Sequence, residues 1–103
     1  MGNQSGINNT ALGADALMSN VSGSYNTAVG KEALQELDNN ADFNTALGFQ
    51  AGDVITTGDN NIMIGYDANP HSQAGTNQIV IGHDADGKGN NKAVLGNNAT
   101  TDV

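Results

Sequence analysis

The sequence predicts an all-β fold, a parallel β-solenoid of six coils that are 14–18 residues long. One short phrase recurs six times, it ends in glycine each time, and the other positions of each unit keep a fixed spacing from that glycine. The copies read NNTALG, YNTAVG, FNTALG, NNIMIG, NQIVIG and NKAVLG. The final glycines are Gly13, Gly30, Gly48, Gly65, Gly82 and Gly96, at intervals of 17, 18, 17, 17 and 14 residues.

Each unit reads G-x-x-N-x-x-Φ-G-x-x-A, where Φ is a branched aliphatic residue. A small residue lies seven positions before each final glycine, at Gly6, Gly23, Ala41, Gly58, Gly75 and Gly89. An alanine lies three positions after it, at Ala16, Ala33, Ala51, Ala68, Ala85 and Ala99. All variation in length falls between units, so the units are repeated structural elements and the variable segments are connections.

The three residues before each final glycine are expected to form a strand, at 10–12, 27–29, 45–47, 62–64, 79–81 and 93–95. Neighbouring side chains of a strand face opposite ways. The last position is always large and branched, so we expect it, together with the alanine column, to fill the core of its own coil. That position holds Leu12, Val29, Leu47, Ile64, Ile81 and Leu95.

The middle position of each strand is expected to face outward, and it is apolar in all six copies. It holds Ala11, Ala28, Ala46, Met63, Val80 and Val94. An apolar outer face needs a cover, and identical chains around a closed axis supply one. These six residues are therefore the expected interface between copies.

Between the strands, we expect the final glycines to form turns that need positive φ or close backbone approach. Apolar spacing of three and four residues predicts short helical turns at 15–19 and 31–37. The position just after the glycine varies freely, which indicates a solvent-facing column. The repeated Asn9, Asn26, Asn44 and Asn61 predict a side-chain ladder between coils, which Gln78 and Lys92 interrupt.

Composition excludes several classes of function. The net charge is −8, with three lysines against eleven acids, so the chain has no basic face for nucleic acid or anionic lipid. No apolar run approaches the ~20 residues of a membrane span. The absence of cysteine leaves the redox compartment open.

No pattern of residues indicates catalysis, a cofactor or a metal centre, so we expect no enzyme. Asp84 and Asp86 lie in HDADGKGN, which superficially resembles an oxygen-ligand Ca²⁺ loop. A lysine sits inside this loop and the distant bidentate Glu is missing, so a surface turn is the preferred interpretation and these two acids are the only metal candidates.

The last interval, GHDADGKGNNKAVLG, resembles the head repeat of trimeric autotransporter adhesins, the YadA-like family. The earlier units, with NTAVGxxAL, resemble longer versions of this repeat in bacteriophage tail fibres. The resemblance implies a left-handed parallel β-roll wound by three identical chains. Asn-Thr replaces the adhesin's Ser-Val in the early units, and most units carry three or four extra residues. We expect a leader at 1–5, the repeat domain at 6–99 and a tail at 100–103.

The function implied by this resemblance is that of a structural or adhesive segment of a homotrimeric attachment fibre. The fibre would be extracellular, in a phage tail that contacts a glycan or protein receptor on a host cell, or alternatively on a bacterial surface. A different class of function, a monomeric ion-binding or ice-binding solenoid, is the other hypothesis. Against ice binding, the column of Thr10, Thr27 and Thr45 continues as Ile62 and Ile79, which we expect to be buried.

Overall fold

A computed structural model of the chain describes residues 5–38 and 40–101. These residues contain six strands of three residues each: β1 (Thr10–Leu12), β2 (Thr27–Val29), β3 (Thr45–Leu47), β4 (Ile62–Ile64), β5 (Ile79–Ile81) and β6 (Ala93–Leu95). They are the six strands that the sequence predicts. Most of the expected leader (1–5) and the end of the expected tail (100–103) lie outside the described residues.

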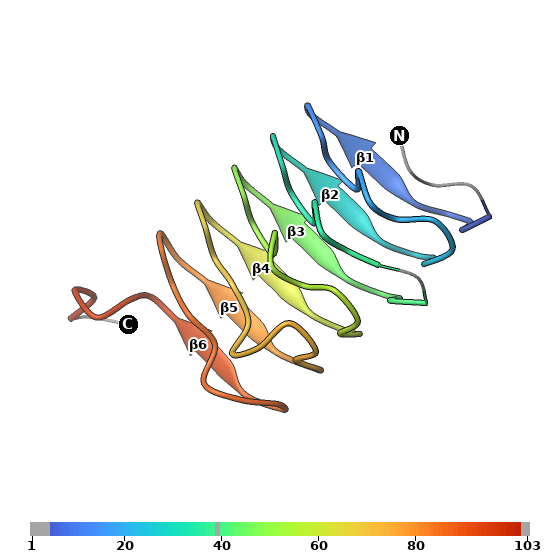
Figure 1. Cartoon of the computed structure of the whole chain (residues 1–103). Coiled ribbons are helices and arrows are strands. Elements are labelled where there is room, and N and C mark those ends of the chain that lie inside the picture. The colour runs from blue at the N-terminus through green and yellow to red at the C-terminus, as the bar shows by residue number, and fades with distance from the viewer. Residues whose placement is uncertain (1–4, 39, 102–103) are drawn as a thin grey trace.

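The strands form one parallel sheet in the order β1-β2-β3-β4-β5-β6 (Figure 1). Equivalent positions of the repeat are paired throughout, so that Thr27 is level with Thr45 and Thr45 with Ile62. Each connection therefore carries the chain once around and advances it by one strand. The fold is an all-β parallel solenoid of about five turns, and we refer to its six repeat units as coils 1 to 6, each named by its strand.

The two sides of the sheet are the reverse of those expected. The middle column points into the coil, where Ala28, Ala46, Met63 and Val80 are completely buried. Ala11 is exposed and Val94 partly exposed, because each belongs to an end coil with a neighbour on one side only. The middle column is therefore core, and its assignment as an interface between copies is wrong.

The column of large branched residues, expected in the core, instead points away from it. Leu12, Leu47 and Leu95 are 66%, 49% and 58% exposed, and Val29, Ile64 and Ile81 are partly exposed. The reason is space, because the inside of each thin coil is already filled. The alanine column occupies it at Ala16, Ala33, Ala51, Ala68 and Ala85, all buried. Ala99 is exposed because no further coil covers it.

Large core residues come from the middle strand column in some coils and from the connections in others. Where the middle column is alanine, buried leucines of the connections fill the coil, as Leu17, Leu34 and Leu37 do. Between Leu34 and Met63 the chain has Gly52, where a Cβ would lie 2.9 Å from Leu34 Cδ2 and 3.4 Å from Met63 Cγ. Close packing requires such compensation.

The expected helical turns are absent. The described residues contain no helix, and the segments at 14–19 and 31–36 are turns. Leu17, Glu32 and Leu34 have positive φ values of 54°, 61° and 49°, which a right-handed helix does not tolerate. Their backbone hydrogen bonds run to the next coil, as from Leu17 N to Ala33 O and from Leu34 N to Ala51 O. The apolar spacing of these segments reflects burial in the solenoid core.

The asparagine ladder is present and holds the coils together from inside. The Asn44 Oδ1 atom accepts hydrogen bonds from Asn61 N and Asn61 Nδ2, both at 3.0 Å. Asn44 Nδ2 donates to Gly58 O at 2.8 Å, and Asn61 repeats this contact with Gly75 O at 2.7 Å. The ladder continues as far as the backbone of Gln78, whose N–H donates to Asn61 Oδ1 at 3.1 Å.

The final glycines stack directly on one another, and Gly30 is the sharpest example. Its φ is +131°, and a Cβ added there would lie 2.5 Å from the Gly48 oxygen and 2.7 Å from its carbonyl carbon. We expect Gly30→Ala to destabilise the chain by more than about 3 kcal/mol in thermal or urea unfolding. Gly89→Ala is the control, because φ is +122° there but the nearest atom is 3.8 Å away. Equal losses in both variants would show that coil contact contributes nothing.

Candidate interaction face

The side of the sheet that points away from the core forms one continuous surface, which we call the outer face. It consists of four columns. Two are the first and last strand positions, and the other two are the positions two residues before the first and two residues after the last. The strand columns are Thr10, Thr27, Thr45, Ile62, Ile79, Ala93 and Leu12, Val29, Leu47, Ile64, Ile81, Leu95. The N-side edge is Asn8, Tyr25, Phe43, Asn60, Asn77, Asn91, and the C-side edge is Ala14, Lys31, Phe49, Tyr66, His83, Asn97.

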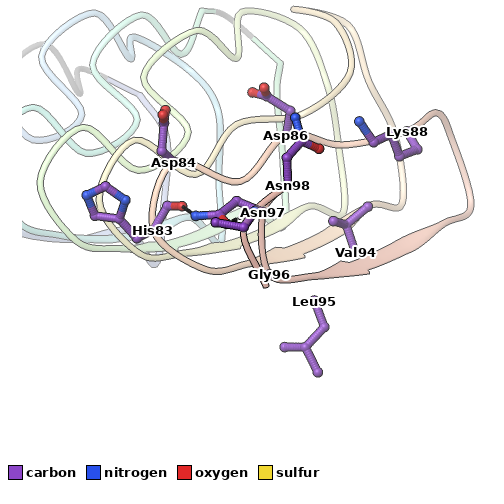
Figure 2. Close-up of a pocket in the computed structure, with 10 residues that line it drawn as sticks. His83, Asp84, Asp86, Lys88, Val94, Leu95, Gly96, Asn97 and Asn98 are labelled. Carbon is purple, nitrogen blue, oxygen red and sulfur yellow. Dashed lines mark hydrogen bonds between the residues drawn. The ribbon is translucent and has the colours of Figure 1, made fainter. Parts of the chain in front are cut away.

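The centre of the outer face is apolar and partly open to solvent. Ile62 and Ile79 are 37% and 40% exposed in one column, beside the exposed leucines of the other. Figure 2 shows the geometry at the last strand, where Leu95 points away from the coil and Val94 lies on its opposite side. Because consecutive strands are paired in register, these side chains form straight rows along the solenoid.

Both edges of the outer face carry stacked aromatic rings. On the N-side edge, the rings of Tyr25 and Phe43 lie 5.0 Å apart and are nearly parallel. On the C-side edge, Phe49 stacks on Tyr66 at 5.6 Å, and Tyr66 contacts the His83 ring at 5.1 Å. All of these side chains are exposed. The aromatic rows therefore border the apolar centre on either side.

The aromatic residues of the N-side edge are held in an unfavourable backbone conformation. Tyr25 and Phe43 have φ values of 60° and 61°, as do the asparagines that occupy the same column in other coils. Asparagine tolerates this left-handed region, whereas for a bulky residue it costs about 1–2 kcal/mol. Leu17 and Leu34 in the connections share this conformation, so the winding of the coil imposes it at several positions of the repeat.

The charge distribution separates the outer face from the rest of the surface. None of the eleven acids of the chain falls in its four columns, and Lys31 is their one basic residue besides the imidazole of His83. The Lys31 ammonium lies 5.5 Å from the centre of the Phe49 ring, so it extends the row of aromatic residues. An anionic chain therefore presents one surface without negative charge.

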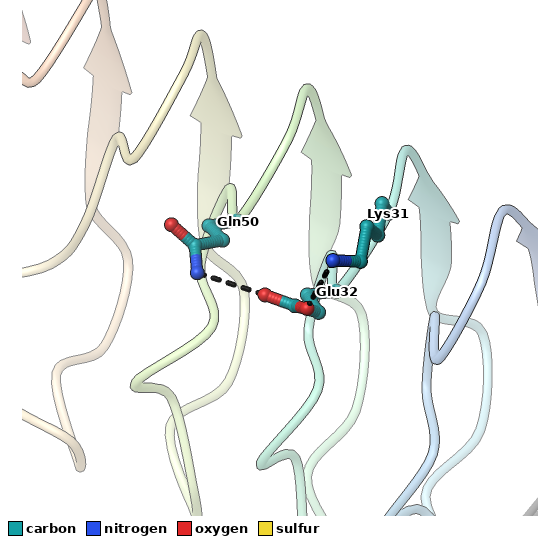
Figure 3. A network of polar contacts seen from close by, with 3 residues as sticks. All are labelled: Lys31, Glu32 and Gln50. Atoms are coloured by element: carbon teal, nitrogen blue, oxygen red, sulfur yellow. Dashed lines mark hydrogen bonds and ion pairs between the residues drawn. The ribbon is translucent and has the colours of Figure 1, made fainter.

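Lys31 is fixed by its neighbours at the border of the outer face (Figure 3). Its Nζ lies 2.9 Å from Glu32 Oε1, and Gln50 Nε2 donates to Glu32 Oε2 at 2.8 Å. The hydrogen bond between Lys31 and Glu32 lowers the pKa of the Glu32 carboxyl and raises the pKa of the Lys31 ammonium. Glu32 belongs to the next column around the coil, so its carboxylate draws the lysine head toward the border.

The metal candidates Asp84 and Asp86 lie at a different place, beside an open recess of about 560 Å³ at the C-terminal end of the solenoid (Figure 2). Both acids are exposed, and Lys88 lines the same recess. Among residues 5–38 and 40–101, no group of three or more His, Cys, Asp or Glu side chains is placed to hold a metal ion. The recess is the space below the last coil, where no further coil is stacked.

The sequence identifies an apolar face but attributes it to the wrong column, and it misses both edges. The residue directly after each final glycine is correctly expected to face solvent. The sequence alone does not show that Phe49, Tyr66 and His83 stack there in one row on the outer face. Within the described part of the chain, no helix could span a membrane. No family model, curated protein or solved structure matches this chain.

Proposed function

We propose that the chain is a structural and adhesive segment of a homotrimeric attachment fibre, in which three copies pack their outer faces around a common axis. The observation that carries this proposal is the outer face itself, a bare apolar surface free of acidic residues on a chain of net charge −8. Covering it with the same face of other copies removes the apolar rows from water without bringing acids together.

The outer face is large enough to be a functional surface. Six strands at ~4.8 Å spacing and a width of about 20 Å outline roughly 480 Å². This lies in the range of about 300–600 Å² that is typical of the largest, often functional, patches on monomers. The face runs through the whole stack of coils, so a longer array of the same repeat would add interface in proportion.

The width of the outer face favours three copies over two or four. Packed sheets lie ~10 Å apart, so each sheet lies about 5 Å from a shared axis. Three sheets at that distance close a triangle with sides of about 17 Å, or about five residues at ~3.3 Å per residue. The span from Phe43 to Phe49 is close to this. Two sheets would leave both edges uncovered, and four would need sides of only about 10 Å.

The biological role follows from this architecture. A rod of stacked coils places a binding tip at a distance from its anchor. From repeat to repeat, the residue types vary in the solvent-facing connections and stay similar in the packed columns. The proposed setting is a phage tail fibre that attaches to a host-cell receptor, with the head of a bacterial trimeric adhesin as the alternative.

One observation favours a second candidate. The threonine column that the sequence places in the core lies on the outer face, with Thr10 exposed and Thr27 and Thr45 partly exposed. A flat array of threonine and aliphatic side chains is a surface suited to ordered water, as in ice binding by a monomer. The column turns to isoleucine from Ile62 onward and aromatic rings rise at both edges, so the trimer accounts for more of the face.

Sedimentation equilibrium separates the two candidates. The trimer predicts a species of three times 10.5 kDa, or 31.5 kDa, for the wild-type chain. It also predicts no thermal hysteresis in an ice-growth assay, because the threonines are covered. A monomer of 10.5 kDa that shows thermal hysteresis would instead establish the ice-binding alternative, and a monomer without it would leave neither candidate standing.

A further inference from the structure

We propose that the two edges of the outer face form the seam between copies, so that the N-side edge of one copy meets the C-side edge of the next at the same height. This inference rests on the proposed function, and it specifies the direction and register of the assembly. It implies that the copies run parallel and that coil 3 of one copy lies beside coil 3 of its neighbour.

The two edges are chemically complementary at coils 2, 3 and 5. At coil 3, Phe43 of one copy would meet Phe49 of the next, which joins the two aromatic stacks. At coil 2, the exposed Tyr25 ring would meet the Lys31 ammonium, a cation–π pair. At coil 5, the Asn77 amide would meet the His83 imidazole, both of which form hydrogen bonds.

The opposite orientation keeps only part of this complementarity. If two copies faced one another antiparallel, each edge would meet its own kind and coil 2 would lie beside coil 5. Lys31 would then meet His83, which places a cation beside a titratable imidazole. Phe43 would meet the polar Asn60 of coil 4 on the partner copy, although Phe49 would still meet Tyr66. An antiparallel arrangement also cannot close a ring of three copies, so the parallel seam accounts for more of the aromatic and basic positions.

Disulfide trapping tests the seam without background cross-links, because the sequence contains no cysteine. The double variant Phe43→Cys/Phe49→Cys should convert most of the chain to a closed three-chain band on a non-reducing gel after mild oxidation. Within one chain these residues are six positions apart along the strand, too far to bridge. Each single variant should stay at the one-chain band, since residue 43 meets residue 49 and not itself.

Two further double variants keep the outcome decisive. Asn77→Cys/His83→Cys probes the same edges at coil 5 while retaining the aromatic side chains, and it should also give the three-chain band. Tyr25→Cys/Asn77→Cys joins two N-side edges, so it should give a two-chain band, and only in an antiparallel assembly. If the wild-type chain sediments as a trimer but neither parallel pair cross-links, the seam is wrong and the trimer stands. A wild-type monomer overturns both proposals.

Discussion

Replacing Val80 with aspartate should abolish folding of the chain. Val80 is completely buried between Met63 and Val94 of the neighbouring strands, so the carboxylate would lose its water without gaining a partner. An unpaired buried charge costs several kcal/mol, which is comparable with the total stability of a small domain. We expect the β-sheet signal in far-UV circular dichroism and the melting transition to disappear.

The adjacent residue provides the matched comparison. Ile79 lies one position earlier on the outer face and is 40% exposed, so Ile79→Asp should leave the coil itself able to fold. In the proposed trimer, three such carboxylates would meet near one axis, and their repulsion in a poorly solvated space should separate the copies. Sedimentation should then show a single chain. A Val80→Asp variant that melts like the wild type would contradict the placement of the middle column in the core.

Removing one rung of the asparagine ladder should have the next largest effect. In Asn44→Ala, the buried Asn61 N–H loses its acceptor and the Gly58 carbonyl loses its donor. Each buried polar group left without a partner costs about 1–3 kcal/mol, so we expect a loss of roughly 3–5 kcal/mol. Urea unfolding followed by circular dichroism measures this difference.

The control for the ladder is Asn98→Ala, which changes an exposed asparagine in the last coil. It should alter stability by less than about 0.5 kcal/mol, as surface substitutions do. If Asn44→Ala is as mild as Asn98→Ala, the side-chain ladder does not stabilise the stack and the backbone pairing of the strands alone holds the coils.

Much of the fold could be read from spacing alone. Six fixed phrases define six strands, because equivalent residues of stacked coils must lie level to pair, and the six expected strands are those observed. The asparagine ladder follows from the same alignment. The helical turns could not be excluded in this way, because Leu17 and Leu34 keep an apolar spacing that a helix and a core-filling turn share.

The direction of each strand face is what spacing does not determine. Alternation says that Ala46 and Leu47 point to opposite sides, but it does not say which side is the core. Size favours Leu47 as the core residue, yet the coil is already filled by its alanine column and by buried residues of the connections such as Leu34 and Ile55. The larger side chains are left outside, where another molecule can cover them. Both columns are apolar, so the outer face is apolar whichever of them points inward.

The most direct test of this account is small-angle X-ray scattering from the wild-type chain in solution, because it reports mass and shape together. The account predicts a forward scattering that corresponds to three chains of 10.5 kDa in a compact prism no longer than one solenoid. A scattering curve that gives one chain, with the radius of gyration near 12.3 Å that belongs to a single solenoid, would show that the outer face stands open to water and would contradict the account.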